Sequence, residues 1–225
     1  MKSVFLRLSS VACLLGFSAT AAAQVPYTFI DVQAVFADSI QVPAAPVGSK
    51  VDGNGARVDG SLGITPWLYL AGGVESIGAD DYVQEDAGGN VSTYPGDDVN
   101  TYNIGIGFNT PVMGRGDRTF RGGVIDSYSL FADARYQGQE RYGIDVNGWQ
   151  LNTGFRSVNF TRMETIIGVG YEKFEQLDGE FTFQGQLLFR IVGNLQLRGG
   201  VNWSDDISRW NVGLRYHFGD WTIFH

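Results

Sequence analysis

Cysteine is almost missing from this sequence of 225 residues. The one cysteine, Cys13, lies in an apolar stretch near the amino terminus, so the rest of the chain has no disulfide and no thiolate metal site. Histidine is nearly as scarce, because the chain holds only His217 and His225. Histidine is the side chain most often used as a general base. The chain therefore has few groups suited to acid–base catalysis.

Long hydrophobic runs and an excess of basic residues are missing as well. A membrane-spanning helix needs about 20 consecutive apolar residues, and no stretch beyond the amino-terminal segment approaches that length. The chain has 16 Lys and Arg residues against 24 Asp and Glu residues, a formal net charge of −8. Such acidity argues against nucleic acid as a partner.

Residues 1–23 have the pattern of a secretory signal peptide. Lys2 and Arg7 precede an apolar stretch at 10–20, and three alanines end at Ala23. The apolar stretch is shorter than the ~20 residues of a permanent helical anchor, which is the alternative. We predict that this segment is cleaved and that the protein is exported through the inner membrane.

Glycine and aromatic residues are abundant, and they occur in alternating segments. The chain has 31 glycines, and aromatic residues make up 13% of it. Polar and apolar residues alternate in ten segments of about 9–11 residues, the length of a tilted membrane-spanning strand. We predict an all-β fold for residues 24–218, a transmembrane up-and-down antiparallel β-barrel, followed by a short tail at 219–225. The expected strands are 27–37, 56–64, 67–75, 99–109, 127–136, 146–156, 163–174, 181–191, 195–204 and 208–218.

An even number of strands places both chain ends in the periplasm and divides the connections into two sets. Outer-membrane barrels pair long external loops with short periplasmic turns. Residues 110–126 are long for a periplasmic turn, so a barrel of eight strands is an alternative. The expected external loops are 39–55, 76–98, 137–145, 175–180 and 205–207, and the expected periplasmic turns are 65–66, 110–126, 157–162 and 192–194.

Aromatic residues gather at both ends of the expected strands, on the face that carries the apolar residues. Two such belts mark the membrane–water interfaces of a barrel. A soluble β-sandwich or lipocalin-like barrel, the alternative fold, would place these rings in a core instead. The outer belt comprises Tyr102, Tyr136, Trp149, Tyr171, Phe183, Trp203 and Trp210, and the inner belt comprises Phe108, Tyr128, Phe155, Phe189, Tyr216 and Phe218.

Most charged residues of the strands fall on the opposite face, toward the lumen. This set has seven arginines and six acids, and the near balance predicts a network of ion pairs, because an isolated buried charge costs several kcal/mol. A ten-stranded barrel is close to the width that side chains can fill. We therefore expect the lumen to be plugged by its own side chains and to conduct ions poorly. The expected lumen residues are Asp31, Arg57, Asp59, Glu75, Asp133, Arg135, Arg156, Glu164, Glu172, Arg190, Arg198, Arg209 and Arg215.

The loop expected at 76–98 is strongly acidic. One interpretation is a site for a divalent cation or for bridging lipopolysaccharide, since hard cations take clustered oxygen ligands. The spacing of the acids matches no EF-hand loop, so a solvated acidic loop is the interpretation that we favour. The acids are Asp80, Asp81, Glu85, Asp86, Asp97 and Asp98.

Neither histidine is well placed for catalysis in this fold. His217 is expected to face the lumen at the periplasmic end, and His225 is the last residue, so neither reaches a substrate at the cell surface. The adjacent acids Asp205 and Asp206 lie in a short loop, where carboxylates are usually solvated. We predict no enzymatic activity, no cofactor and no bound metal.

The last expected strand fits the assembly signal of bacterial outer-membrane barrels. Its signature positions are Asn211, Gly213, Tyr216 and Phe218. Together with the export signal, this strand predicts a location in the cell outer membrane. The expected partners are the barrel-assembly machinery, outer-membrane lipid and lipopolysaccharide, and the expected state is a monomer.

Short glycine-rich motifs distributed over residues 27–218 resemble a known family. They are YTFID at 27–31, GSLGITP at 60–66, GG at 72–73, IGIGFNTP at 104–111, GVGYE at 168–172 and VGLRYHF at 212–218. The chain resembles the small outer-membrane β-barrel family regulated by diffusible signal factor and, more broadly, OmpA-like small barrels. The resemblance implies an outer-membrane or vesicle location, roles in motility, biofilm formation or signalling, and no catalytic residues. The long turn and the tail depart from the family's pattern.

Two functions are compatible with such a barrel. We predict an envelope-structural or cell-surface interaction role, with the lumen plugged by the network of arginines and acids. The alternative is a narrow porin-like channel for small polar solutes, in which the network leaves a file of water. An outer-membrane enzyme is the third and least supported class.

Overall fold

A computed structural model describes residues 28–41, 50–65, 67–85, 91–110, 127–141, 144–159, 163–175, 178–204 and 207–218. The predicted signal peptide, residues 111–126 of the long turn and the predicted tail lie outside these ranges. Within them, no helix is long and apolar enough to cross a membrane.

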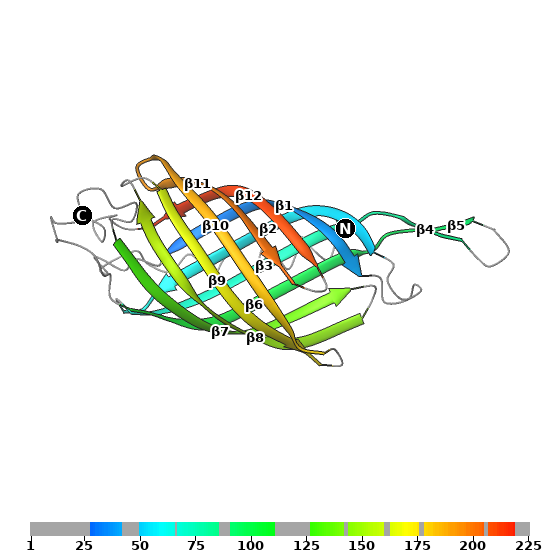
Figure 1. The fold of residues 1–225 in the computed structure, drawn as a ribbon, viewed down its shortest axis with the longest axis horizontal. Helices are drawn as coiled ribbons and strands as arrows, with labels where there is room; N and C mark the ends of the chain where they lie inside the picture. Colours follow the sequence, from blue (N-terminus) through cyan, green and yellow to red (C-terminus); the bar gives the residue numbers. More distant parts are fainter. Residues whose placement is uncertain are drawn as a thin grey trace.

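Ten antiparallel strands close into one barrel (Figure 1). Each strand pairs with the next barrel strand in sequence, and β1 pairs with β12 to complete the ring, so no edge is left unpaired. The predicted ten-stranded antiparallel barrel is confirmed, and the eight-stranded alternative is wrong. The strands are β1 (Phe29–Gln41), β2 (Lys50–Gly63), β3 (Leu68–Ala79), β6 (Asp98–Asn109), β7 (Ser127–Arg141), β8 (Ile144–Asn159), β9 (Met163–Phe174), β10 (Glu180–Val192), β11 (Leu195–Trp203) and β12 (Ser208–His217).

The two ends of the barrel are named by the course of the chain. β1 begins and β12 finishes at the same end. We call this the periplasmic end, because bacterial barrels with an even number of strands keep their short turns and chain ends there. The opposite end is called the outer end.

Several strands extend further at the outer end than the sequence pattern predicted. β1 reaches Gln41, β2 already begins at Lys50, and β7 and β8 remain paired through Glu140 and Asp145. The described parts of the loops expected at 39–55 and 137–145 are therefore strand, at 39–41, 50–55, 137–141 and 144–145. The alternation of polar and apolar residues ends where lipid ends, whereas backbone pairing continues beyond it because the ladder hydrogen bonds do not require lipid.

The segment expected as the loop 76–98 contains a second, two-stranded sheet in the form of a hairpin. Strands β4 (Tyr82–Glu85) and β5 (Val91–Tyr94) pair with each other and project beyond the outer end of the barrel (Figure 1). This corrects the prediction of a simple acidic loop. Asp81 Oδ1 accepts a hydrogen bond from the backbone N–H of Gly96 at 3.0 Å, which ties the base of the hairpin together.

The predicted alternation of faces is confirmed along the strands. In β12, Trp210, Val212 and Tyr216 are exposed, whereas Asn211 and Arg215, which alternate with the exposed residues, are buried. The same pattern surrounds the barrel, so its outer surface is a continuous apolar band. An apolar surface of this extent in water would drive aggregation, whereas in a bilayer it contacts hydrocarbon. The soluble alternatives are therefore wrong, and the chain is a barrel of the outer-membrane type.

The aromatic residues of both predicted belts occupy the strand positions whose side chains face outward. Neighbouring rings pack together on this surface, as Trp149 and Tyr171 do at 5.5 Å between ring centroids and Tyr128 and Phe155 do at 5.6 Å. Such rings are stable at the boundary between lipid and water because they have both apolar and polar edges. Their position at the outer and inner membrane interfaces stays a prediction.

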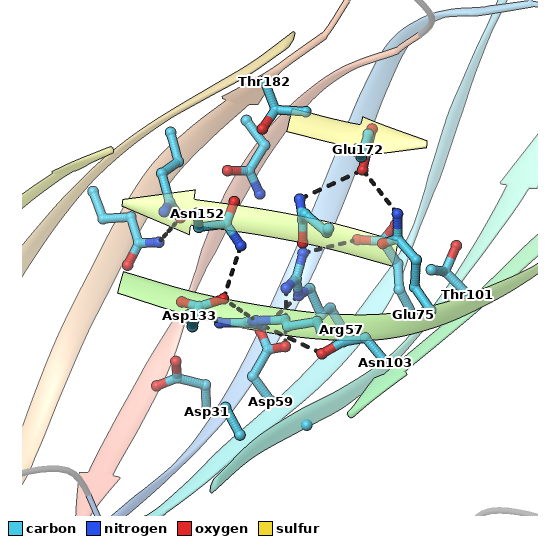
Figure 2. A pocket seen from close by; sticks show the side chains of 18 of the residues that line it. Asp31, Arg57, Asp59, Glu75, Thr101, Asn103, Asp133, Asn152, Glu172 and Thr182 are labelled. Carbon is cyan, nitrogen blue, oxygen red and sulfur yellow. Dashed lines mark hydrogen bonds and ion pairs between the residues drawn. The ribbon is translucent and has the colours of Figure 1, made fainter. Parts of the chain in front are cut away.

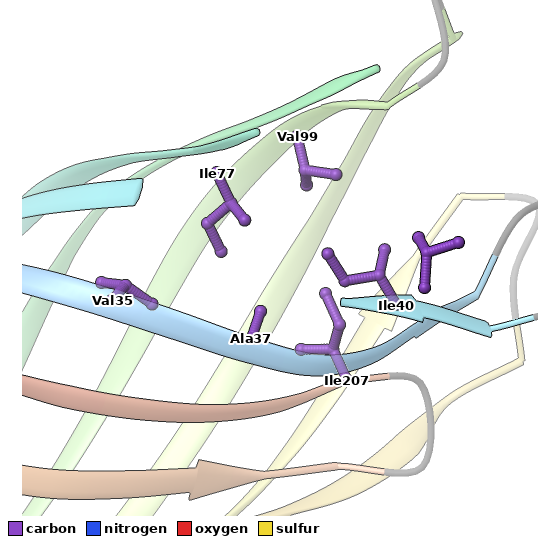
Figure 3. Close-up of a cluster of buried hydrophobic side chains, with 7 residues drawn as sticks. Val35, Ala37, Ile40, Ile77, Val99 and Ile207 are labelled. Carbon is purple, nitrogen blue, oxygen red and sulfur yellow. The ribbon is translucent and has the colours of Figure 1, made fainter. Parts of the chain in front are cut away.

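An apolar cluster occupies the lumen near the outer end, on the wall formed by β1, β2, β3 and β6. This cluster was not predicted. Figure 3 shows the side chains pointing inward from the strands and from the segment that precedes β12. Because these residues take up one side of the outer lumen, open space remains toward the other side. The members are Val35, Ala37, Ile40, Val51, Ile77, Val99 and Ile207.

A charged residue on the lipid-facing surface is expected to destabilise the barrel according to its depth. Ile104→Arg, near the middle of β6, lowers the free energy of unfolding by about 2–4 kcal/mol, whereas Tyr102→Arg, nearer the interface, costs about 0–1 kcal/mol. Urea unfolding in lipid vesicles, followed by tryptophan fluorescence, measures both. Equal costs for the two variants would contradict the assigned position of the membrane.

Candidate functional site: the polar lumen

A narrow polar cavity extends along the inside of the barrel. Its volume is about 190 Å³, and all ten barrel strands contribute to its lining. At about 10–15 Å³ for each water, it has room for roughly 13 to 19 water molecules. Phe29 and Asn109 line it at the periplasmic end, and Gln139 and Glu180 line it at the outer end. The side chains of the lumen thus narrow the interior without filling it.

Asp31 on β1 is the centre of the charged side chains in the periplasmic half. It is completely buried, and its carboxylate accepts two hydrogen bonds from Arg215, from Nε and Nη2, each at 2.8 Å. Arg198 on β11 donates to the same carboxylate from Nη1. The guanidinium of Arg215 also lies over the ring of Phe29, at 3.9 Å from its centroid. One carboxylate therefore holds two buried arginines.

The network continues from Arg215 toward β8 and β9. Arg215 Nη1 lies 3.9 Å from Glu164, and the carboxylate of Glu164 lies 2.5 Å from Arg156 Nε. Gln196 connects this group to the predicted lumen histidine, because its Oε1 lies 3.0 Å from His217 Nε2. His217 thus faces the lumen, as the sequence predicted, and has a neutral polar partner there.

In the other direction, the network continues from Arg198 to β2 and β3. Arg198 lies 3.9 Å from Asp59, which receives a two-pronged hydrogen bond from Arg57 at 2.6 and 2.9 Å. Arg57 also lies 3.6 Å from Glu75, and Glu75 lies 3.0 Å from Arg209 Nε. Figure 2 shows Arg57 among these acids. Nine charged side chains are therefore linked around the lumen wall from β8 to β3.

A separate ion pair lies across the lumen on β7. Arg135 Nε donates to Asp133 at 2.8 Å, and Arg135 also donates to Asn103 Oδ1 at 3.3 Å. The Asp133 carboxylate further accepts a hydrogen bond from Asn152 at 2.9 Å (Figure 2). It also accepts one from the Tyr69 hydroxyl at 3.3 Å. These contacts fix the charged groups on the wall opposite the Asp31 network.

Amide side chains dominate the outer half of the cavity. Glu172 is a lumen residue as predicted, but it accepts hydrogen bonds from Gln137 at 3.1 Å and Gln150 at 3.4 Å instead of pairing with an arginine (Figure 2). Gln184 and Gln186 line the same region. This part of the wall offers neutral donors and acceptors, with the Glu172 carboxylate held between two of the amides.

Arg190 differs from the other predicted lumen arginines. It has inward parity, but its Nε donates to the carbonyl of Gly193 at 2.7 Å, in the turn between β10 and β11. Gly193 has a positive φ of 54°, a conformation that favours glycine and directs its carbonyl toward the arginine. Arg190 therefore stabilises a periplasmic turn and is not part of the cavity lining.

The remaining sequence predictions concern chemistry and assembly. Among the described residues, no group of three or more His, Cys, Asp or Glu side chains could hold a metal ion. Asp86, Asp205 and Asp206 lie outside the described ranges. In β12, Asn211 is buried while Tyr216 is exposed, the parity of the predicted assembly signal. Recognition of that signal by the assembly machinery stays a prediction.

Four lumen residues of the periplasmic end were not singled out from the sequence. They are small, amide or aromatic side chains. The strand pattern predicts that they face inward, but nothing in it distinguishes them from residues that only fill the lumen wall. The residues are Ser61, Tyr69, Asn109 and Phe131.

Comparison with known proteins finds solved structures that are similar to this chain in fold. No protein-family model matches the chain, and no curated protein matches it. The structure described as KdgM porin in complex with disordered oligogalacturonate is similar at 14% identity and a TM-score of 0.46, over 84% of this chain and 98% of that one. The β domain of the Bordetella autotransporter BrkA is similar at 10% identity and a TM-score of 0.46, over 84% and 99% of the two chains. The resemblance to the family regulated by diffusible signal factor stays a prediction, and the chain itself is a ten-stranded antiparallel barrel of the outer-membrane type.

Proposed function

We propose that the protein is a narrow outer-membrane channel for small polar solutes. The observation that carries this proposal is the polar cavity, whose lining residues extend from the periplasmic ends of the strands to their outer ends. A barrel that served only as a scaffold would gain stability by filling this space with packed side chains. In this proposal the protein acts as a monomer, without a cofactor and without catalysis.

The chemistry of the wall favours solutes that are small and weakly charged. The acids at the narrow periplasmic half are matched by arginines, as Asp59 is by Arg57 and Asp133 is by Arg135. Paired charges present little net field to an ion, while their remaining hydrogen-bonding edges still contact water. The amides of the outer half add neutral donors and acceptors. The wall therefore suits uncharged polar molecules and hydrated small ions, without strong selection between cations and anions.

Reconstitution in planar bilayers tests the proposal. The wild-type protein is expected to give small, discrete current steps with weak selectivity between cations and anions, because the lumen is narrow and its charges are paired. Proteoliposomes are expected to swell faster in glycerol than in raffinose, because the cavity excludes the larger solute. Current and swelling equal to those of protein-free membranes would contradict a channel.

An envelope-structural or surface-interaction role is the second candidate. It is favoured by the β4–β5 hairpin, which extends beyond the barrel and leaves Val83 and Val91 65% and 64% exposed. Exposed apolar side chains on a projecting hairpin are typical of a contact surface. A silent bilayer experiment with correctly folded protein would favour this candidate over the channel.

A further inference from the structure

Two buried polar side chains at the periplasmic end of the cavity have no hydrogen-bond partner. Asn109, the last residue of β6, is 1% exposed, and neither its Nδ2 nor its Oδ1 is bonded to another described residue. Ser61 on β2 is 6% exposed, and its Oγ is also without a partner among the described residues. Both side chains line the cavity. Such groups usually have partners in native proteins, so these two call for an explanation.

The orphaned amide contrasts with two other asparagines of the same lumen. Asn103 on the same strand and face accepts a hydrogen bond from Arg135, and Asn152 donates one to Asp133. Leaving a buried donor or acceptor unpaired costs about 1–3 kcal/mol. Asn109 therefore has unused capacity to donate and to accept hydrogen bonds, directed at the cavity.

Aromatic rings lie beside these two polar groups. A Cβ atom added at Gly107 would lie 2.0 Å from Tyr69 Cζ, and one added at Gly154 would lie 2.6 Å from Phe131. The two rings therefore lie against the wall where glycine leaves room, and both line the cavity. Glycine is needed at these positions because of the close approach of a ring.

Strand pairing brings the four residues to one region. Ser61, Tyr69, Asn109 and Phe131 come from β2, β3, β6 and β7, which are consecutive in the barrel. Asn109 is directly paired with Phe131, and Tyr69 is paired with Gly107, two residues before Asn109. The orphaned polar groups and the rings thus form one concave surface at the periplasmic end of the lumen.

The charges near this surface are already matched. Asp31 is held by two arginines, and Arg156 is paired with Glu164. An ionic ligand would have to compete with these buried pairs, whereas a neutral ligand would leave them intact. The surface therefore favours an uncharged ligand.

We propose that Asn109, Ser61, Tyr69 and Phe131 form a binding site for an uncharged polyhydroxylated solute of monosaccharide size. An amide that both donates and accepts matches adjacent hydroxyl groups, and a ring face covers the apolar C–H face of such a solute. This inference rests on the proposed channel, for which it names the class of solute. The cavity volume of about 190 Å³ sets the upper size.

Calorimetric titration of the detergent-purified protein with glucose tests the site independently of conduction. The wild-type protein is expected to bind glucose, and Asn109→Ala is expected to weaken binding about tenfold, corresponding to the loss of about 1.4 kcal/mol. Ser61→Ala is expected to weaken it several-fold. Asn103→Ala, on the same strand and face but outside the site, is the matched control and keeps the wild-type affinity for glucose. Glucuronate is expected to bind more weakly than glucose, because its carboxylate disturbs the paired charges.

The outcomes separate the site from the channel. Glucose binding that is lost in Asn109→Ala supports the site even if bilayers stay silent, in which case only the channel fails. A conducting protein that binds no glucose overturns the site and leaves the channel standing. Equal weakening by Asn109→Ala and Asn103→Ala also overturns it. If Asn109→Ala does not fold, as judged by heat-dependent gel mobility, Ser61→Ala decides alone, and an unchanged affinity in that variant overturns the site.

Discussion

Replacing Asp31 by alanine is expected to lower the free energy of unfolding of the barrel by about 3–5 kcal/mol. Asp31 is completely buried and accepts hydrogen bonds from both Arg198 and Arg215, whose side chains are only 5% and 4% exposed. Removing the carboxylate takes the nearest counter-charge away from two buried arginines, because the next acids, Asp59 for Arg198 and Glu164 for Arg215, lie 3.9 Å away. The cost of a poorly paired buried charge is large.

Urea unfolding in lipid vesicles measures this effect, with Asp38→Ala as the matched control. Asp38 lies on the same strand but is exposed, so its replacement is expected to change stability by no more than about 0.5 kcal/mol. A second variant that also replaces Arg198 and Arg215 by methionine is expected to recover much of the loss, because it removes the poorly paired charges. Equal stability of Asp31→Ala and Asp38→Ala would show that the network does not stabilise the fold.

Replacing Arg198 by alanine is expected to raise the single-channel conductance several-fold while the barrel stays folded. The side chain of Arg198 lines the cavity and extends from β11 past β12 to Asp31 on β1, so its removal widens the cavity. Folding is retained because Asp31 keeps its two hydrogen bonds to Arg215 at 2.8 Å. The loss of an arginine that shares its acid is therefore far less costly than the loss of the acid.

Planar bilayer recording measures the conductance, with Arg198→Met as the control that keeps most of the side-chain volume. If the arginine narrows the lumen by its bulk, the methionine variant stays close to wild type. If the lumen of the wild type is plugged, its bilayers are silent and only Arg198→Ala leaks. A conductance that is unchanged in the alanine variant would show that solutes do not pass this residue.

Which charged residues pair in the lumen could not be predicted from the sequence alone. The sequence predicted that the arginines and acids of the inward face would balance, and that balance is present. It did not predict that Asp31 would pair with both Arg198 and Arg215, because these partners are 167 and 184 positions away along the chain. Which charges meet depends on barrel closure and on the register between β1, β11 and β12, and neither is encoded in the local alternation.

The same limit applies to Glu172 and Asn109. Glu172 has the parity of the paired acids, yet its level along the barrel places it among glutamines instead of arginines. Asn109 has the parity of Asn103, and only the register of β6 against β7 leaves one amide bonded and the other without a partner. Whether a residue has an odd or an even position along a strand determines which face its side chain lies on. Its height along the barrel axis determines which side chains are its neighbours.

The sequence by itself determined that these strands have one face for lipid and one for a polar interior, because a period of two along a strand separates the two solvents residue by residue. The number of barrel strands, the inward and outward faces and the aromatic belts all follow from that pattern. Tertiary structure alone decided the outer β4–β5 hairpin, the apolar cluster beside the lumen and the unfilled polar cavity. These features depend on how ten strands stagger as they close, which brings distant residues to the same level.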